Sequence, residues 1–166
     1  MKVIKFKEIN STNEYAKTAY QELDNNTVII AKHQTAGKGR LGRTWLDKDA
    51  NSALFTILIK DHLNTSNISN LTLLMATSVL KVLNNITPGF SIKWPNDIYY
   101  QDKKVVGILT ESKINNNNVE YVIIGVGINV NQNEFDDSLN AISVRQITNQ
   151  KTDIDTLIIK IATTFI

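Results

Sequence analysis

Cysteine is absent from the sequence of 166 residues. The chain can therefore form no disulfide, offers no thiolate to a metal ion and has no cysteine nucleophile. A protein without disulfides suits a reducing compartment, so we expect a cytoplasmic location.

The sequence also lacks a long apolar run and a large net charge. No stretch is long enough to span a bilayer, and the alternating segment 2–6 does not resemble a signal peptide. The formal net charge of +2 is too small to indicate nucleic-acid binding through bulk charge. Hydrophobic residues make up 42% and charged residues 20%, as in globular proteins, and the length fits one domain with its own core. We therefore expect neither a membrane nor DNA as a partner.

Glycine is scarce, and three of the seven glycines fall within residues 37–42. Glycine lets the backbone adopt positive φ and approach a ligand closely, and successive N–H groups of such a loop can form a nest for an anion. The cations Lys38, Arg40 and Arg43 lie among these glycines, and Trp45 offers a flat surface for a ring. The run predicts a site for a molecule with a negative group at one end and a flat group at the other, such as a nucleotide.

The same run has plainer interpretations, because glycine and basic residues are common in solvated loops and in loops that touch nucleic acid. It is not a Walker A loop. The spacing from Gly37 to Gly42 fits, but Arg43 occupies the position that requires lysine.

Periodicity predicts an α/β (α+β) domain with a mixed, largely antiparallel sheet flanked by helices. The connections at 101–103 and 113–118 have hairpin length, which favours antiparallel pairing. The last expected strand, residues 119–130, is almost continuously apolar, which indicates that both of its faces are covered. An exposed edge near Val119 would allow a homodimer. Expected strands cover residues 3–9, 27–32, 52–60, 90–94, 98–100, 104–112 and 119–130. Expected helices cover residues 11–23, 68–86 and 153–166, and the polar segment 132–150 shows at most short helical pieces.

Polar residues cluster where the first expected helix begins and where the second expected strand ends. Ser11 and Glu14 match a capping box, and the helix N-terminus could also receive a polar ligand. Gln34, at the end of its strand, carries both donors and an acceptor. Capping alone would explain the first group equally well.

A second group of motifs follows near the middle of the chain. Lys93-Trp94-Pro95-Asn96-Asp97 presents a cation, an aromatic ring and a carboxylate at one strand end, although a plain hairpin turn would look similar. The glycines at 107, 125 and 127 interrupt strands, as expected where a backbone passes close to another group.

Together these motifs resemble the catalytic domain of biotin–protein ligases, of the class without an N-terminal DNA-binding domain and with a fold like that of class II aminoacyl-tRNA synthetases. The resemblance covers most of the chain, in the family's order. It is carried by Ser11-Thr12-Asn13, Gln34-x-x-Gly37-Lys38-Gly39-Arg40-x-Gly42-Arg43-x-Trp45, Lys93-Trp94-Pro95-Asn96-Asp97, Lys104-x-x-Gly107-Ile108-Leu109 and Gly125-x-Gly127-Ile128-Asn129.

The resemblance implies a two-step reaction. Biotin and ATP, with Mg²⁺, form biotinyl-5′-AMP and pyrophosphate, and a lysine of a biotin carboxyl carrier protein domain then attacks the mixed anhydride. Such chemistry needs cations and oriented N–H groups around the phosphates, but no nucleophile from the enzyme.

The resemblance also implies roles for individual residues. Lys104, Arg40 and Arg43 are the expected catalytic cations, and Asp97 is the expected aid to a metal ion. The expected biotin site comprises Ser11, Thr12, Asn13, Gln34, Gly37, Lys38, Arg40, Lys104 and Gly107. The expected nucleotide site comprises Lys38, Arg40, Arg43, Trp45, Lys93, Asn96 and Asn129.

Two positions depart from the family pattern. Lys38 replaces the usual arginine and loses its bidentate fork, and Leu41 stands where a third basic residue is common. We expect residues 1–166 to form one catalytic domain, without the family's N-terminal DNA-binding domain or small C-terminal β-domain.

Two alternatives within the same fold stay open. One is a lipoate ligase or acyltransferase, although these lack an arginine-rich glycine loop that ends in tryptophan. The other is a module that binds biotin or a nucleotide with reduced turnover.

Overall fold

The computed structural model describes residues 1–47, 50–116 and 118–166. The strands are β1 Lys2–Ile9, β2 Thr27–Gln34, β3 Ser52–Ile59, β4 Phe90–Lys93, β5 Asp97–Tyr100, β6 Lys103–Asn115 and β7 Asn118–Asn129. The helices are α1 Thr12–Ala19, α2 Ile68–Asn84, α3 Val144–Thr148 and α4 Ile154–Phe165, with single 3₁₀ turns η1 Arg40–Gly42 and η2 Thr65–Asn67.

All seven strands belong to one sheet in the order β1-β2-β3-β7-β6-β5-β4. Only β1 and β2 pair in parallel, and every other neighbouring pair is antiparallel. Hairpins join β4 to β5, β5 to β6 and β6 to β7, and the last two are those that the short connections at 101–103 and 113–118 predicted. The expected mixed, largely antiparallel sheet is confirmed.

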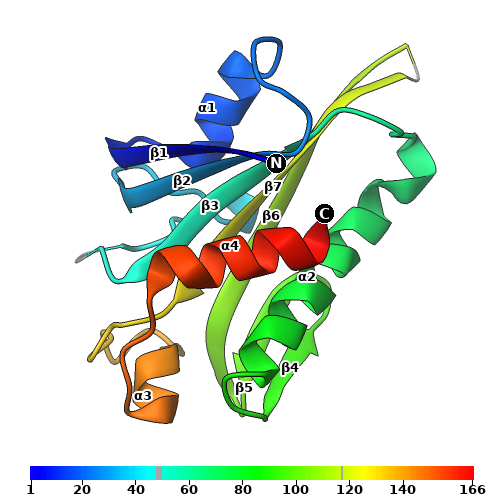
Figure 1. Ribbon diagram of the computed structural model, residues 1–166. Helices are drawn as coiled ribbons and strands as arrows, with labels where there is room; N and C mark the ends of the chain where they lie inside the picture. Colours follow the sequence, from blue (N-terminus) through cyan, green and yellow to red (C-terminus); the bar gives the residue numbers. More distant parts are fainter. Residues whose placement is uncertain (48–49, 117) are drawn as a thin grey trace.

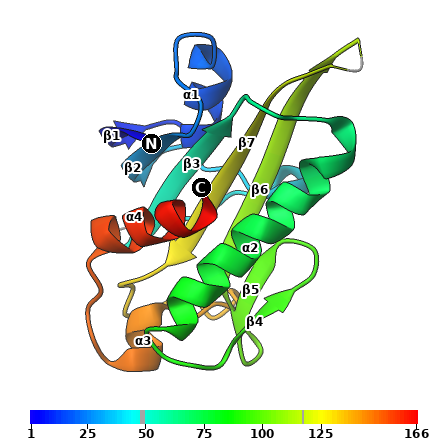
Figure 2. The ribbon, with the colours of Figure 1, turned by 45° about the vertical axis from the view of Figure 1, so that its right-hand side comes forward.

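The helices cover the two faces of the sheet unequally. Figures 1 and 2 show α2 and α4 lying across one face. Phe55 and Ile57 of β3 point into the large core beneath these two helices, whereas Leu58 joins a smaller cluster under α1. Because side chains alternate along a strand, α1 lies on the opposite face. There α1 packs on β2, β3 and β7, and the face beyond it provides the floor of the site described below.

Helix α1 is shorter than expected. The Ser11 hydroxyl accepts a hydrogen bond from the Glu14 N–H at 3.4 Å, so the N-cap is as predicted. The return bond of the capping box is not made, because the Glu14 carboxylate pairs with Lys17 and Lys38 instead. The helix ends at Ala19 rather than Leu23, since the chain turns there and buries Leu23 against the smaller cluster.

The other helices lie close to their predicted positions. Helix α2 ends at Asn84 instead of 86, and α4 begins after Asp153, whose carboxylate caps it by accepting from the Thr156 N–H at 2.8 Å. The segment 132–150 contains the short helix α3.

The edge expected near Val119 exists only at the start of that strand, because residues 118–121 pair with β6 alone, whereas residues 122–129 also pair with β3. Strand β7 lies between β3 and β6, and Val119 itself is buried. Its apolar run reflects an interior position covered on both faces. Residue 117, in the expected hairpin tip, lies outside the described residues. Within the described ranges, no helix is both long enough and apolar enough to cross a bilayer.

The core predicts a stability contrast within α2. Leu83 is fully buried, whereas Leu73 on the same helix is 50% exposed. Leu83→Ala should lower the free energy of unfolding by about 2–5 kcal/mol, because it removes buried methyl groups and leaves a cavity. Leu73→Ala is the matched control and should change it by less than about 0.5 kcal/mol. Urea unfolding of both variants measures the difference, and equal losses would contradict this packing.

Candidate active site

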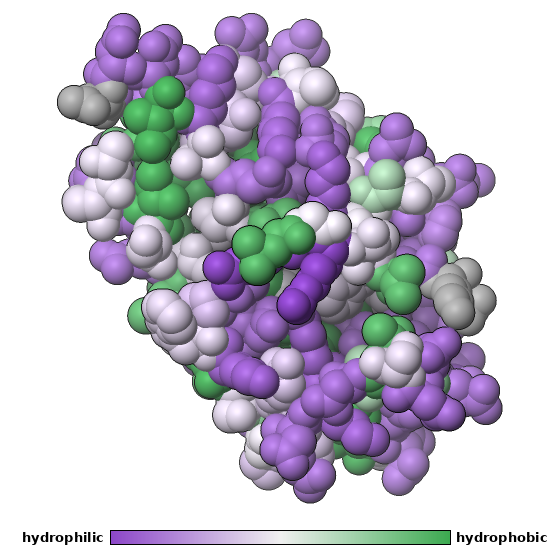
Figure 3. Space-filling model, turned by 180° about the vertical axis from the view of Figure 1, so that it is seen from behind, coloured by the Kyte–Doolittle hydropathy of each residue, from purple (hydrophilic) through white to green (hydrophobic). Residues whose placement is uncertain are grey.

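The sheet face that carries α1 holds a cavity of about 510 Å³. Figure 3 shows the molecule from behind, away from α2 and α4, with a largely hydrophilic surface interrupted by separate apolar spots. The cavity floor is formed by β3, β6 and β7. Its walls are formed by the start of α1, the end of β2, the glycine loop (defined as residues 35–45), the turn at 96–97 and residues of the segment 132–141.

One end of the cavity is polar but uncharged. Ser11, Thr12 and Asn13 line it at the N-terminus of α1, and each is only 3% exposed. The Oε1 atom of Gln34 accepts hydrogen bonds from the Thr12 N–H at 2.7 Å and from the Thr12 hydroxyl at 2.9 Å. The Gln34 amide is therefore fixed with its NH₂ group available as a donor.

The glycine loop folds back on itself above the floor. The Gly39 N–H donates to the Arg43 carbonyl at 2.7 Å, and the Trp45 N–H donates to the Gly37 carbonyl at 3.0 Å. Leu41 and Gly42 adopt positive φ at the tip. The loop is thus closed by its own backbone hydrogen bonds, and its side chains are free to reach in different directions.

Trp45 anchors the loop to the sheet. Gly107 of β6 lies opposite Gly127 of β7, and both leave the floor without side chains at that point. A Cβ atom added at Gly127 would lie 2.6 Å from the indole ring of Trp45, and one at Gly107 would lie 2.9 Å from it. Only glycine at these positions permits the observed contact, so the sequence's strand glycines form the floor under Trp45.

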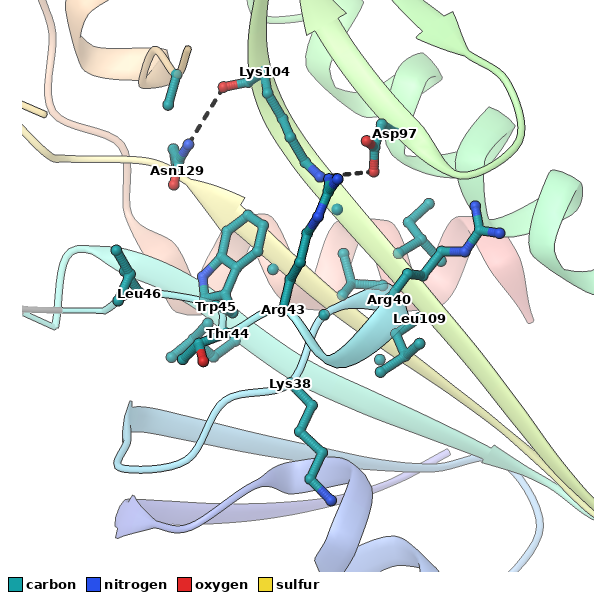
Figure 4. Close-up of a pocket in the computed structure, with 18 of the residues that line it drawn as sticks. Lys38, Arg40, Arg43, Thr44, Trp45, Leu46, Asp97, Lys104, Leu109 and Asn129 are labelled. Carbon is teal, nitrogen blue, oxygen red and sulfur yellow. Dashed lines mark hydrogen bonds and ion pairs between the residues drawn. The ribbon is translucent and has the colours of Figure 1, made fainter. Parts of the chain in front are cut away.

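The other end of the cavity carries the cations. The Lys104 Nζ atom forms an ion pair with Asp97 Oδ1 at 2.9 Å, and it lies 6.0 Å from the centre of the Trp45 ring. In Figure 4 the Arg43 side chain extends toward Lys104 and Asp97. Asn129 also lines this end, and its amide donates to the Lys104 carbonyl at 3.4 Å.

Arg40 and Asn96 are joined to each other. The Arg40 guanidinium donates to Asn96 Oδ1 at 2.7 Å, and the Asn96 amide donates to the Ile108 carbonyl at 2.7 Å. Asn96 therefore holds Arg40 against β6. Both residues line the cavity.

Three predicted site residues lie differently from the expectation. Lys93 is not among the residues that line the cavity, and its ammonium lies 4.4 Å from the centre of the Tyr99 ring. The Lys38 ammonium turns away from the other cations and pairs with Glu14 at 2.9 Å (Figure 4). Gly37 lines a second hollow, formed by the glycine loop with Leu109 and Glu111. Lys38 still lines the cavity, and the roles expected for Gly37 and Lys38 rest on their backbone, so all three roles stay predictions.

The charges beside α1 form a compact group of their own. The ammonium groups of Lys17 and Lys38 hold the pKa of the Glu14 carboxyl below its usual value. Burial lowers the pKa of Lys17, but its bonds to Glu111 and Glu14 together raise it above its usual value. The Lys17 ammonium is therefore firmly charged beside the neutral end of the cavity.

Sequence reasoning missed several residues near the site. Thr56 contacts Thr12, and Glu111 contacts Asn13. Gln132 is the first lining residue of the segment 132–141. Alternation along β3 places Thr56 on the same face as Leu54 and Leu58, and this pattern could have revealed it. The wall segment has no comparable pattern.

No cluster of three or more histidine, aspartate or glutamate side chains that could hold a metal occurs among the described residues. Asp97 is a single carboxylate whose charge is already paired with Lys104. Its predicted role at a metal ion stays a prediction.

Comparison with known proteins gives concordant matches. Residues 5–129 match the model of the biotin/lipoate A/B protein ligase family. The bifunctional ligase/repressor BirA of Bacillus subtilis is 39% identical over 146 residues, which cover 82% of this chain and 45% of that protein. The biotin–[acetyl-CoA-carboxylase] ligase of Paracoccus denitrificans is 32% identical over 124 residues, which cover 73% of this chain and 51% of that protein.

A solved structure extends the match to the fold. The biotin protein ligase from Aquifex aeolicus in complex with biotin and ATP matches with a TM-score of 0.83 and 35% identity, over 99% of this chain and 68% of that chain. The present chain spans about half the length of the curated relatives that it matches.

The glycine floor predicts a spectroscopic effect. In a Trp94→Phe background, Trp45 is the only remaining tryptophan. Gly127→Ala should push its ring off the sheet, because the new methyl group would lie 2.6 Å from it. The fluorescence of Trp45 should shift to the red and become easier to quench with acrylamide. Gly39→Ala is the control, since its Cβ would come no closer than 3.3 Å to other atoms. Unchanged quenching in Gly127→Ala would contradict the proposed floor.

Proposed function

This chain belongs to the biotin/lipoate A/B protein ligase family, and we propose that it acts as an ATP-dependent biotin–protein ligase. In this proposal residues 1–166 form the catalytic domain. It activates biotin as biotinyl-5′-AMP and transfers the biotinyl group to a lysine of a biotin carboxyl carrier protein domain.

One observation carries the proposal, namely that the two ends of the cavity differ in chemistry. The neutral end offers the hydrogen-bonding groups of Ser11, Thr12 and Gln34, which suit an uncharged polar ring. The opposite end offers Lys104 and Arg43, which suit phosphates and a carboxylate. A molecule with a ureido ring at one end and a carboxylate at the other fits this arrangement.

In the first step, a biotin carboxylate oxygen attacks the α-phosphorus of ATP, and the bond to the bridging oxygen breaks to release pyrophosphate. Negative charge is brought together and moves onto the leaving oxygens, so fixed cations nearby favour the transition state. We assign this role to Lys104 and Arg43. The ion pair of Lys104 with Asp97 holds the ammonium at this end before the substrates arrive.

The nucleotide side of the proposal involves Trp45 and Asn129. Trp45 presents an aromatic surface between the two ends, and Asn129 offers an amide beside the backbone of Lys104. An adenine ring can stack on the first and exchange hydrogen bonds with the second.

In the second step, the acceptor lysine amine attacks the acyl carbon of the mixed anhydride, and AMP leaves with the electrons of the broken C–O bond. The chain needs only to retain the adenylate and to admit the amine. The glycine loop, held to β6 by the Arg40–Asn96 bond, is the part of the wall that we assign to retention.

In this proposal Mg²⁺ binds together with ATP, through the phosphate oxygens. Mg²⁺ in nucleotide sites is commonly held by one or two carboxylates together with phosphate oxygens and water, and Asp97 fits as one such carboxylate. The ion would supply positive charge to the phosphates.

Lipoate ligation is the second candidate, because the matching family model covers biotin and lipoate ligases. The hydrogen-bonding groups at the neutral end favour biotin, since the dithiolane ring of lipoate has no N–H or carbonyl group to pair with them.

A cytoplasmic location belongs to the same proposal, because it supplies ATP and suits a chain without cysteine. We further propose that the chain does not bind DNA. A homodimer stays a prediction to be tested by measuring molar mass in solution.

The substrate can be identified directly. Incubation with ATP and biotin should yield a bound product with the mass of biotinyl-AMP, and incubation with ATP and lipoate should yield no adenylate. A lipoyl adenylate as the main product would replace the proposed function with the second candidate.

Lys104→Ala should slow pyrophosphate release by about two orders of magnitude, corresponding to roughly 3 kcal/mol of transition-state stabilisation. Biotin binding should change far less, because the groups of the neutral end are untouched. Lys103→Ala is the matched control, since Lys103 is its exposed neighbour on the same strand. Normal pyrophosphate release by Lys104→Ala would remove Lys104 from the catalytic group.

Arg40→Gly should still form biotinyl-AMP but release it, so that lysines of a bystander protein such as serum albumin become biotinylated. Leu41→Gly is the matched control, because it adds the same backbone freedom to the same loop at a residue that is 89% exposed and already at positive φ. Equal bystander labelling by the two variants would mean that Arg40 does not help to retain the adenylate.

A further inference from the structure

A chain of polar contacts lies beneath the neutral end of the cavity. The Thr56 hydroxyl of β3 lies 2.7 Å from the Thr12 hydroxyl and 2.6 Å from Asn13 Oδ1. The Thr12 hydroxyl lies 2.9 Å from Gln34 Oε1. The chain therefore runs from Asn13 through two hydroxyl groups to Gln34, and each link is short enough for a hydrogen bond.

This row of hydrogen-bonding groups has one proton fewer than it has contacts. It has three contacts, but only the hydroxyl groups of Thr12 and Thr56 can place a proton in them, and each has one. The two ends, Asn13 Oδ1 and Gln34 Oε1, are acceptors. At any moment one of the three contacts joins two oxygens without a proton between them, so the group has one acceptor in excess.

Both acceptors at the ends have fixed orientations. Gln34 Oε1 accepts from the Thr12 backbone N–H at 2.7 Å, so the amide cannot be reversed. The Asn13 NH₂ group donates to the Glu111 carboxylate at 2.9 Å and lies 3.5 Å from the Leu109 carbonyl. Since both of these partners only accept, Asn13 must direct its oxygen toward Thr56.

Neighbouring residues hold Glu111 and Asn13 in these positions. Lys17 pairs with the other oxygen of the Glu111 carboxylate. Gly125 of β7 leaves space for the Asn13 side chain, because an added Cβ would lie 2.3 Å from Asn13 Oδ1. Thr56 is fully buried, and Thr12 and Asn13 are 3% exposed, so water has little access to the oxygen contact that lacks a proton.

We propose that Thr56, Asn13 and Glu111 are positioning residues that keep Thr12 and Gln34 one hydrogen-bond donor short, so that the site selects ligands whose ring carries an N–H group. Thr12 and Gln34 line the cavity, so a ligand N–H can reach the surplus acceptor. Asn13 also lines the cavity, and in this proposal it acts through Thr56 and Thr12. The identity of the full ligand rests on the proposed function, whereas the demand for an N–H group rests on these contacts alone.

The inference gives Glu111 a specific role. With a glutamate at 111, Asn13 can present only its oxygen to Thr56. A glutamine at 111 could donate as well as accept, which would allow Asn13 to reverse its amide and supply the missing donor from within the protein. The site would then lose its preference for an N–H group although every side chain kept its size.

The first test uses small rings, independently of ligase activity. The probes are 2-imidazolidinone, a bare cyclic urea, and 1,3-dioxolan-2-one, which has the same ring with oxygen in place of each N–H. Binding is followed by the NMR shift of the Thr12 amide during titration. The full chain should bind the urea about tenfold more tightly than the carbonate, as expected for one hydrogen bond to a buried acceptor. Equal binding of the two rings would overturn the inference.

The second test uses variants and biotin. Thr56→Val should raise the KM for biotin in pyrophosphate release about tenfold and lower kcat by less, and Thr56→Ser should restore the KM. Thr72→Val is the matched control, because Thr72 and Thr110 form a similar hydroxyl contact at 2.7 Å on the other face of the sheet. Glu111→Gln should also raise the KM and should not add to the effect of Thr56→Val, since both act through Thr12.

The outcomes separate this inference from the proposed function. If the cyclic urea is preferred but no biotinyl-AMP forms, the proposed function fails and the inference stands. If biotinyl-AMP forms but Thr56→Val resembles Thr72→Val, or the effects of Thr56→Val and Glu111→Gln simply add, the inference fails and the proposed function stands.

Discussion

The contact of Trp45 with two opposed glycines is the constraint on which the site depends. Strands β6 and β7 pair so that Gly107 faces Gly127 across one hydrogen-bonded ladder. A side chain at either position would collide with the indole ring, because it would come within 2.9 Å of it. The glycine loop is closed by its own backbone bonds, so seating its last residue on the sheet determines where the loop's cations lie. A shift of one residue in the pairing of β6 with β7 would break this contact, since it would turn one of the two glycines to the other face of the sheet.

The two ends of the site use different polar interactions, namely directional hydrogen bonds at one end and charge–charge interactions at the other. Hydrogen bonds among uncharged groups fill one end, where direction matters because each donor must meet an acceptor. Cations gather at the other end, where charge matters more than direction. The net charge of only +2 conceals this arrangement, because it sums 18 basic and 16 acidic residues over the whole sequence and does not show that Lys104 and Arg43 line one cavity. Bulk charge is therefore a poor guide to the ligand, and the local grouping of charges is a good one.

The sequence predicted the elements well because their signals are local. The alternating and 3.6-residue patterns of apolar residues placed every strand and the three main helices within a few residues of their observed bounds. Helix α1 is the main exception, since it ends early to bury Leu23, a tertiary contact that no local pattern shows. The edge expected near Val119 is confined to residues 118–121 for a similar reason, because strand order depends on pairing between distant segments.

By itself, the sequence determined the residue types at the site: a loop of glycines and cations that ends in tryptophan, polar residues at the start of α1, and glycines in the strands. These follow from chemistry that is written in neighbouring residues. Only the tertiary structure decided which of them meet. It turned Lys38 toward Glu14 and Lys93 toward Tyr99, brought Asp97 to Lys104, and placed Thr56 and Glu111 behind Thr12 and Asn13. The physical reason is that several of these contacts join residues that lie far apart in the chain, and that packing and strand register set the direction of every side chain, which a linear pattern does not contain.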